Sequence, residues 1–252
     1  MPTQKSTETH EEVAEEKEVS DQESEEITSA QKKFGIESIP DRYEPWEDEG
    51  VFHFAYSIVQ GWATVVDIIR CWELWDLVHQ TAHLEGALLE VGCWNGGSGG
   101  IIGLAAKKAG IRDTTFLCDT FSGTVKGNNV DAGYVDDGAF SSASKKLVER
   151  VLFGLQVSNY KILEGIFPEE TGYLLGDSRI RFCHIDVDTY QSAADTYEWV
   201  WPRLVVGGIL VYDDYGYLVT PGISKHVNEI RHGEDRISVY NLNEHAVLIK
   251  TK

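Results

Sequence analysis

Positive charge is scarce in this chain of 252 residues. It carries 22 Lys and Arg against 41 Asp and Glu, so its formal net charge is −19 at pH 7. A protein that binds nucleic acid through the phosphates needs clustered Lys and Arg to neutralise them. We therefore expect no nucleic-acid partner and predict that this chain binds a small molecule.

Long apolar runs and paired cysteines are also missing. No apolar run approaches the roughly 18 to 20 residues that cross a bilayer, and the N-terminus is acidic rather than basic and then apolar. We therefore expect no membrane contact and a cytoplasmic location. The four cysteines form no CxxC pair, which favours buried structural thiols over a metal or redox motif.

Acidic charge is concentrated at the start of the chain. The first 30 residues contain two lysines and ten acids and almost no large apolar residue. Such a segment cannot bury enough surface to order itself, so residues 1–33 are predicted to be a disordered acidic tail. Residues 34–84 are predicted to form a helical cap or lid, because apolar residues recur every three or four positions through residues 51–83.

Short apolar runs alternate with helical patterns from residue 85 onward, which is typical of βαβ units. The closing segments 237–240 and 246–249 are joined too tightly for a parallel crossover and must be antiparallel. Residues 85–252 are therefore predicted to be an α/β domain with a Rossmann-like, doubly wound, seven-stranded sheet, mostly parallel with a C-terminal antiparallel hairpin. The other predicted strands are 87–91, 115–118, 161–164, 181–185 and 208–212, and the predicted helices are 98–109, 143–155, 191–201 and 221–230.

A glycine-rich turn, LEVGCWNGGSG at residues 89–99, follows the first predicted strand. Glycines at a strand-to-helix turn let backbone amides approach a ligand closely. A dinucleotide site would show GxGxxG, whereas the acid-x-Gly-x-x-x-Gly spacing here resembles the first motif of S-adenosylmethionine enzymes. Asp119 ends the next strand, where an acid can accept hydrogen bonds from ribose hydroxyls. The alternative for Asp119 is a turn cap.

Four aspartates follow two neighbouring strands of the predicted sheet. Asp186 and Asp188 come after the fourth strand, and Asp213 and Asp214 come after the fifth. The ends of adjacent parallel strands meet at one edge of the sheet, the same edge that carries the glycine turn. Such a cluster is costly unless a cation neutralises it, and oxygen ligands favour Mg²⁺. The alternative is that these aspartates cap helices, and His184 is predicted to be a packed core histidine.

Together these motifs resemble the macrocin O-methyltransferase (TylF-like) family of class I S-adenosylmethionine-dependent methyltransferases. The resemblance runs from about residue 50 to the C-terminus. It rests on EVGCWNGGS at 90–98, DTFSG at 119–123, GIFPEET at 165–171, HIDVDTYQS at 184–192, DDYG at 213–216 and PG at 221–222. The chain departs from the family at Asn95, where members often carry Arg, and in its acidic tail, which we expect to lie outside the family core.

The resemblance implies an enzyme that methylates a hydroxyl of a sugar or glycosylated natural product, using S-adenosylmethionine and Mg²⁺. It implies Asp186, Asp213 and Asp214 as metal ligands and Asp188, or Asp186 itself, as general base. The expected cofactor-binding residues are Glu90, Gly92, Trp94, Gly96, Ser98, Asp119, Gly165 and Asp186. The sequence does not decide whether the chain forms a homo-oligomer.

An aliphatic hydroxyl is a weak nucleophile, so it needs a Lewis acid, a base or both. Two adjacent hydroxyls would chelate a metal well, so we predict a vicinal diol acceptor. Substrate contacts are expected from residues 43–57 and from the Gly-, Asn- and Asp-rich segment 123–140, whose length and composition suit a mobile lid.

The sequence leaves two other functional classes as alternatives, because a fold alone does not determine function. One is an NAD-linked oxidoreductase, which the absence of GxGxxG after the first strand disfavours. The other is a non-catalytic small-molecule-binding relic of the same fold, which the four strand-end aspartates disfavour.

Overall fold

A computed structural model describes residues 43–133 and 135–252 of the chain. The predicted acidic tail and the first part of the predicted cap, residues 34–42, lie outside the described residues. Within those residues, no helix combines the length and the apolar character that crossing a membrane requires.

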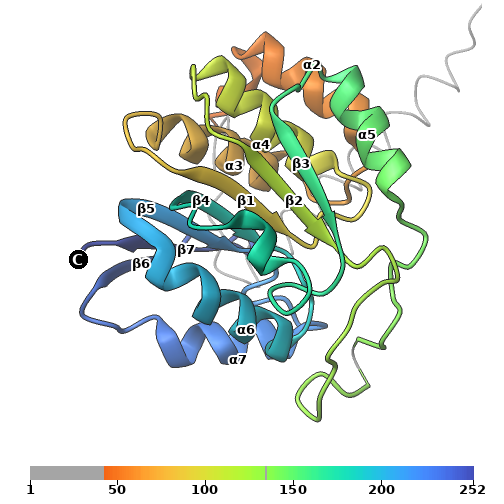
Figure 1. Ribbon diagram of the computed structural model, residues 1–252, viewed down its shortest axis with the longest axis vertical. Helices are drawn as coiled ribbons and strands as arrows, with labels where there is room; N and C mark the ends of the chain where they lie inside the picture. Colours follow the sequence, from red (N-terminus) through yellow and green to blue (C-terminus); the bar gives the residue numbers. More distant parts are fainter. Residues whose placement is uncertain (1–42, 134) are drawn as a thin grey trace, which may run out of the picture. The chain divides into compact units, whose positions relative to one another are not determined.

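A seven-stranded sheet forms the centre of the structure, with the strand order β3-β2-β1-β4-β5-β7-β6 (Figure 1). The first five strands run parallel, and β7 lies antiparallel to both β5 and β6. The strands are β1 (Ala87–Val91), β2 (Thr115–Asp119), β3 (Tyr160–Glu164), β4 (Ile180–Ile185), β5 (Leu204–Tyr212), β6 (Arg236–Tyr240) and β7 (Ala246–Lys250). The predicted fold class is confirmed, including the antiparallel C-terminal hairpin.

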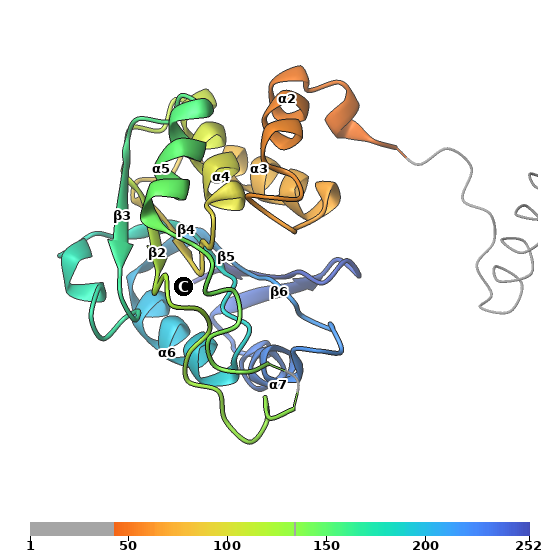
Figure 2. The ribbon, with the colours of Figure 1, turned by 90° about the vertical axis from the view of Figure 1, so that its right-hand side faces the viewer.

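Helices cover both faces of the sheet, as the two ribbon views show (Figures 1 and 2). Residues of α2, α3, α4 and α5 share one buried cluster with one face, and residues of α6 and α7 share a second cluster with the other. The α-helices are α2 (Gly50–Val59), α3 (Ile68–Gln80), α4 (Gly97–Lys108), α5 (Lys145–Gly154), α6 (Tyr190–Val200) and α7 (Pro221–Ile230). Short 3₁₀ turns are η1 (Pro45–Glu47), η2 (Gly172–Leu175) and η3 (Trp201–Arg203).

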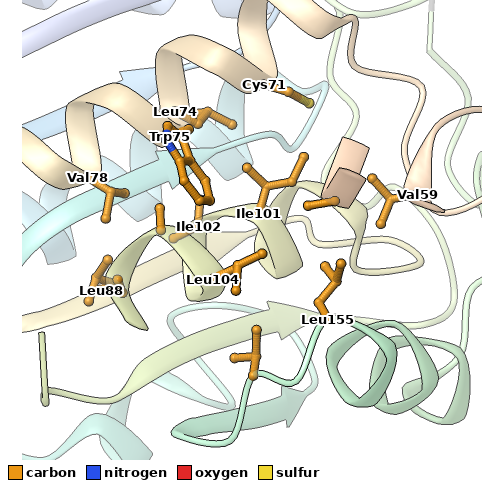
Figure 3. Close-up of a cluster of buried hydrophobic side chains, with 14 of the residues drawn as sticks. Val59, Cys71, Leu74, Trp75, Val78, Leu88, Ile101, Ile102, Leu104 and Leu155 are labelled. Atoms are coloured by element: carbon orange, nitrogen blue, oxygen red, sulfur yellow. The ribbon is translucent and has the colours of Figure 1, made fainter. Parts of the chain in front are cut away.

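The core follows from the period-two alternation of side chains along each strand. Leu88 packs into the α2–α5 cluster and its neighbour Leu89 into the α6–α7 cluster, and both are fully buried. Figure 3 shows Leu74 and Trp75 of α3 near Ile101 of α4, in the same buried cluster as Val78. The four cysteines are buried and unpaired, as predicted for structural thiols.

Two predicted boundaries are wrong for local backbone reasons. Residues 51–83, predicted as helical, form two helices with a non-helical break between them, because Gly61 adopts a positive φ of 78° and Asp67 starts α3 by accepting from the amides of Ile69 and Arg70. Strand β5 begins at Leu204 rather than at residue 208. Leu204 already pairs with Ile180 of β4, and the pairing of the two strands then shifts in register around Gly207, which has a φ of 82°.

Candidate active site

A cavity of about 710 Å³ opens at the carboxyl ends of the parallel strands. This is the edge of an open α/β sheet where ligands are expected. Its lining includes residues of the turn after β1, the ends of β2, β4 and β5, and the loop that follows β2. The sequence-predicted residues that line it are Gly92, Trp94, Ser98, Asp119, Gly165, Asp186, Asp188, Asp213 and Asp214.

The glycine-rich turn brings the backbone of β1 very close to that of β4. Gly92 has a φ of 90°, and a Cβ there would lie 1.6 Å from the backbone oxygen of Asp186. Only glycine fits such an approach. Gly96, with φ of 85°, directly precedes α4 but packs against Val148 rather than lining the cavity. The turn therefore presents the N-terminus of α4 to the cavity, where its free amides favour a carboxylate.

Glu90 lies under α4 and not in the cavity wall. Its side chain is fully buried, its Oε1 atom is 3.0 Å from Nδ1 of His184, and its Oε2 atom has no hydrogen-bond partner. A Cβ at Gly99 of α4 would meet that Oε2 atom at 2.3 Å. Glu90 can therefore influence a bound cofactor through α4 and through charge, but it offers no direct contact from this position.

Asp119 organises the loops at the end of β2. Its Oδ2 atom accepts from the backbone amide of Trp94 at 2.7 Å, and its Oδ1 atom accepts from that of Phe121 at 2.8 Å. Burial raises the pKa of Asp119 even though these amides lower it. Because each carboxylate oxygen has a second lone pair, Asp119 can both hold the turn and accept a ligand hydroxyl.

Three half-buried or buried carboxylates, those of Asp186, Asp188 and Asp214, converge in the cavity wall. One oxygen from each lies within 4.8 Å of the others. Burial, followed by repulsion from Asp213, raises the pKa of Asp186 well above its usual value and that of Asp214 to about 8. Burial raises the pKa of Asp188 to about 6. These carboxylates lack sufficient counter-charge within the protein, which is what a hard divalent cation would supply.

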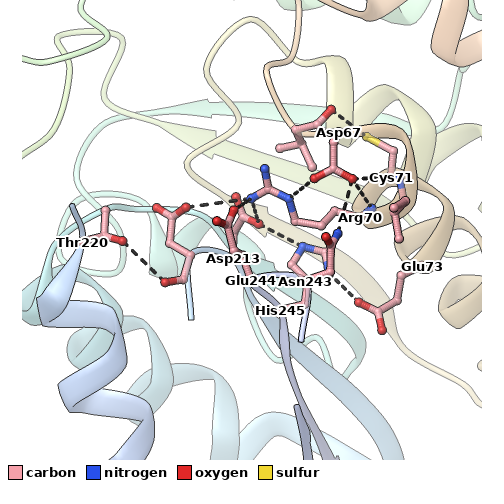
Figure 4. A network of polar contacts seen from close by, with 12 residues as sticks. Asp67, Arg70, Cys71, Glu73, Asp213, Thr220, Asn243, Glu244 and His245 are labelled. Carbon is pink, nitrogen blue, oxygen red and sulfur yellow. Dashed lines mark hydrogen bonds and ion pairs between the residues drawn. The ribbon is translucent and has the colours of Figure 1, made fainter. Parts of the chain in front are cut away.

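Asp213 lies beside this cluster but is neutralised by the protein. Its Oδ1 atom accepts from Nη1 of Arg70 at 2.8 Å and contacts Nε2 of His245 at 2.9 Å (Figure 4). Burial would raise the pKa of Asp213, but the hydrogen bond and charge of His245 and the charge of Arg70 lower it to about 2. The sequence motif brought Asp213 to this edge without revealing its partners.

Those partners were missed by the sequence reasoning. Arg70 and Glu73 lie on α3, and His245 directly precedes β7. Glu73 Oε2 is 2.6 Å from Nδ1 of His245, and Arg70 also binds Asp67 at 2.7 Å. No local motif marks these residues, because their contacts with one another and with Asp213 join segments far apart in the chain.

The loop between β2 and α5, which contains the predicted lid 123–140, does line the cavity. Its described lining residues are Thr120 and, within the predicted lid, Gly123, Thr124, Val125, Val135, Asp136, Ala139 and Phe140. The loop is tied to α6, because Thr189 Oγ1 donates to Val125 O at 2.9 Å and the fully buried Asp131 accepts from the amide of Tyr190. Lys126 also binds Asp195 of α6 at 2.7 Å.

The helical segment contributes to the wall at residues 63–66 and at Arg70, not at the expected residues 43–57. Asn95, where the chain departs from the family pattern, donates to the backbone oxygen of Trp62 at 2.9 Å. This hydrogen bond links the glycine-rich turn to the connection between α2 and α3.

Comparisons with known proteins agree with this geometry. The profile of the family described as macrocin O-methyltransferase (TylF) matches residues 8–244 of the chain, beginning well before the first motif. A search of curated proteins finds no match.

Solved structures of methyltransferases share the fold. The O-methyltransferase NovP is 22% identical with a TM-score of 0.63, covering 75% of this chain and 83% of its own. The calicheamicin methyltransferase CalS11 is 16% identical with a TM-score of 0.64, covering 83% and 94%. TomG from Streptomyces achromogenes, solved with S-adenosylmethionine, is 11% identical with a TM-score of 0.51, covering 89% and 96%.

Proposed function

The chain belongs to the macrocin O-methyltransferase (TylF) family of S-adenosylmethionine-dependent O-methyltransferases, and from this premise we propose that it methylates a hydroxyl of a sugar or glycosylated natural product with the help of Mg²⁺. The observation that carries the proposal is the meeting of the glycine turn with the Asp186, Asp188 and Asp214 carboxylates in one cavity. Methyl donor and acceptor hydroxyl can then be held side by side.

The cofactor half of the cavity is formed by the glycine turn, Asp119 and Gly165. The amides at the start of α4 suit the amino-acid carboxylate of S-adenosylmethionine, and Asp119 suits the ribose hydroxyls. The backbone of Asp186 lies directly against Gly92, so Asp186 is the member of the acidic cluster that adjoins the glycine-rich turn.

The acidic cluster supplies the groups that act on the acceptor. Asp186 and Asp214 would hold Mg²⁺, with Asp188 as the third carboxylate that the geometry offers and Asp213 as the one that the family resemblance implies. When bound, this ion would polarise the acceptor oxygen and lower the pKa of its proton. Asp188, or Asp186, would take the proton, and the acceptor oxygen would bond to the methyl carbon of S-adenosylmethionine as the bond from that carbon to sulfur breaks and S-adenosylhomocysteine leaves.

The similar proteins and the cavity both favour a sugar-type acceptor. CalS11 is described as a TDP-rhamnose 3'-O-methyltransferase, and TomG is described as involved in tomaymycin synthesis. Neighbouring hydroxyls suit a site with several closely spaced carboxylates and one cation, so a vicinal diol remains our proposed acceptor.

Calorimetric titration tests the cofactor and metal proposals separately. S-adenosylmethionine and S-adenosylhomocysteine are titrated into chelator-treated protein, with and without Mg²⁺, and Mg²⁺ is titrated separately, in the wild-type chain and in Asp119→Ala and Asp214→Asn variants. We expect Asp119→Ala to weaken cofactor binding and Asp214→Asn to weaken only Mg²⁺ binding. Absence of cofactor binding by folded wild-type protein would overturn the proposal.

Asp177→Asn is a matched control, since Asp177 is an exposed acid outside the cavity lining. It removes one negative charge without touching the site. If Asp177→Asn weakened Mg²⁺ binding as much as Asp214→Asn, the ion would be responding to overall charge and not to the cluster.

A further inference from the structure

Three apolar side chains in the cavity wall are open to solvent. Val65, in the connection between α2 and α3, is 65% exposed, and Tyr217 and Val219, in the connection between β5 and α7, are 43% and 45% exposed. Single exposed apolar residues are common on protein surfaces. These three differ because each also lines the cavity, so they lie where the cavity meets solvent. Val65, Tyr217 and Val219 are called the apolar rim below.

The apolar rim adjoins the acidic cluster. The backbone amide of Tyr217 donates to the backbone oxygen of Asp214 at 3.0 Å. Val65 is in the segment that leads into α3, and Arg70 of α3 donates to Asp213 at 2.8 Å (Figure 4). Both segments of the rim are therefore fixed at the end of β5, on the side of the cavity where the acceptor hydroxyl is expected.

The cavity offers an anionic acceptor very little positive charge. Among its described lining residues, Arg70 is the one Lys or Arg, and it is already bonded to Asp67 and Asp213. The same lining contains seven acids, which are Asp119, Asp136, Asp186, Asp188, Asp213, Asp214 and Glu244. A nucleotide-linked sugar carries a pyrophosphate directly beside the sugar. Like charges that meet across an interface disfavour binding strongly, so this cavity is poorly suited to such an acceptor.

The nearest loop lysine does not change this balance. Lys126, between β2 and α5, is bonded to Glu169 at 2.6 Å and to Asp195 at 2.7 Å, and it does not line the cavity. Its charge is already neutralised by these two carboxylates. What the mouth of the cavity offers on the acceptor side is apolar surface, which gains from contact with an uncharged apolar group.

We propose that the apolar rim binds the apolar aglycone of a glycoside, so that the acceptor is a sugar already joined to its aglycone and not a nucleotide-linked sugar. This inference rests on the proposed function and narrows its acceptor. The sugar hydroxyls reach the acidic cluster, while the uncharged aglycone covers Val65, Tyr217 and Val219. A glycosyl transfer must then supply the acceptor before it is methylated.

Matched acceptor pairs test the proposal, because both members of a pair carry the same sugar. One member is a methylumbelliferyl glycoside, which has an uncharged apolar aglycone, and the other is the thymidine diphosphate derivative. Rhamnose and glucose pairs are assayed with S-adenosylmethionine and Mg²⁺, and the methylated product is measured by mass spectrometry. We expect kcat/KM to be roughly 100-fold higher for the methylumbelliferyl glycoside. An equal or higher value for the nucleotide-linked sugar would overturn the proposal.

Variants of the rim test where the aglycone binds. Tyr217→Ser and Val219→Ser should each raise KM for the methylumbelliferyl glycoside by roughly 10-fold, without changing the affinity for S-adenosylhomocysteine. The methyl glycoside of the same sugar lacks the apolar group and should not respond. Leu218→Ser is the matched control, because Leu218 is 84% exposed and lies outside the cavity lining. If Leu218→Ser raised KM as much as the rim variants, the rim would not be the aglycone site.

Saturation-transfer NMR decides the matter if neither sugar is methylated, because it detects weak binding without turnover. We expect saturation of the methylumbelliferyl protons by the wild-type chain and its loss in Tyr217→Ser. Absence of that saturation in the wild-type chain, or stronger saturation of the nucleotide-linked sugar, would overturn the proposal. Calorimetric binding of S-adenosylmethionine on the same samples separates the two questions, since a folded chain that binds no cofactor fails as a methyltransferase whatever its acceptor.

Discussion

Asp213 and Asp214 are adjacent in the sequence but belong to two different chemical environments. Asp213 faces Arg70 and His245, which together lower its pKa to about 2, whereas burial and neighbouring aspartates raise the pKa of Asp214 to about 8. Arg70 Nη1 lies 2.8 Å from Asp213 but 3.9 Å from Asp214. At the end of β5, therefore, the protein itself neutralises the carboxylate of Asp213, whereas the carboxylate of Asp214 is left free to bind a cation.

The same contrast holds for buried histidines. Burial would lower the pKa of His245, but hydrogen bonds with Asp213 and Glu73 raise it to about 9. His226 on α7 contacts the hydroxyl of Tyr212 at 3.0 Å, and burial lowers its pKa to about 4. Burial alone thus favours the neutral form, and only facing carboxylates reverse that preference.

The largest expected effect is on catalysis in the cavity cluster. Asp188→Asn should lower the rate of methyl transfer by roughly 100- to 10,000-fold, the usual contribution of a general base. The fold should be kept, because Asp188 has a φ of 61° and Asn tolerates this left-handed conformation. Steady-state kinetics with calorimetric cofactor binding checks this, and an unchanged rate would remove Asp188 from the mechanism.

The next effect is on stability, in the neutralised network. Arg70→Met should lower the free energy of unfolding by about 3–5 kcal/mol, because it leaves buried Asp213 with less counter-charge. Denaturant unfolding measures this loss. Lys225→Met, which breaks the exposed pair with Glu229, is the control and should change stability little. If the two variants lost the same free energy of unfolding, the ion pair of Arg70 with Asp213 would contribute no more to stability than an exposed ion pair.

The smallest effect is the pH dependence from His226. Its folded pKa, about 4, lies below the usual 6.5, so the unfolded chain gains a proton first as pH falls. Stability is therefore lost as pH drops below 6.5, by about 2 kcal/mol between pH 7 and pH 5. His226→Gln should remove this portion of the acid sensitivity in denaturant titrations at the two pH values. Identical pH dependence in variant and wild type would contradict the assignment.

Most of the fold could be predicted from sequence because its signals are local. The short apolar run at residues 87–91 placed β1 with its observed bounds, and Pro221 marked the start of α7. Wrong boundaries arose where a glycine conformation decided the matter, as at Gly61 between α2 and α3.

The site was predictable only in part. Parallel strand ends brought the four aspartates to one edge, and His184 was rightly expected in the core, where it is fully buried. What separates Asp213 from the other three is contact with Arg70 and His245. Those contacts form only when α3 and the segment before β7 pack against the end of β5. No local sequence pattern predicts that packing.

The most direct test of the account is methyl transfer from isotopically labelled S-adenosylmethionine to paired glycosides that differ only in the hydroxyl next to the methylated one. Each pair is assayed with Mg²⁺ and with chelator. The account predicts transfer to the vicinal diol that stops when Mg²⁺ is removed. Equal methylation of the acceptor without the neighbouring hydroxyl, or transfer that persists in chelator, would contradict it.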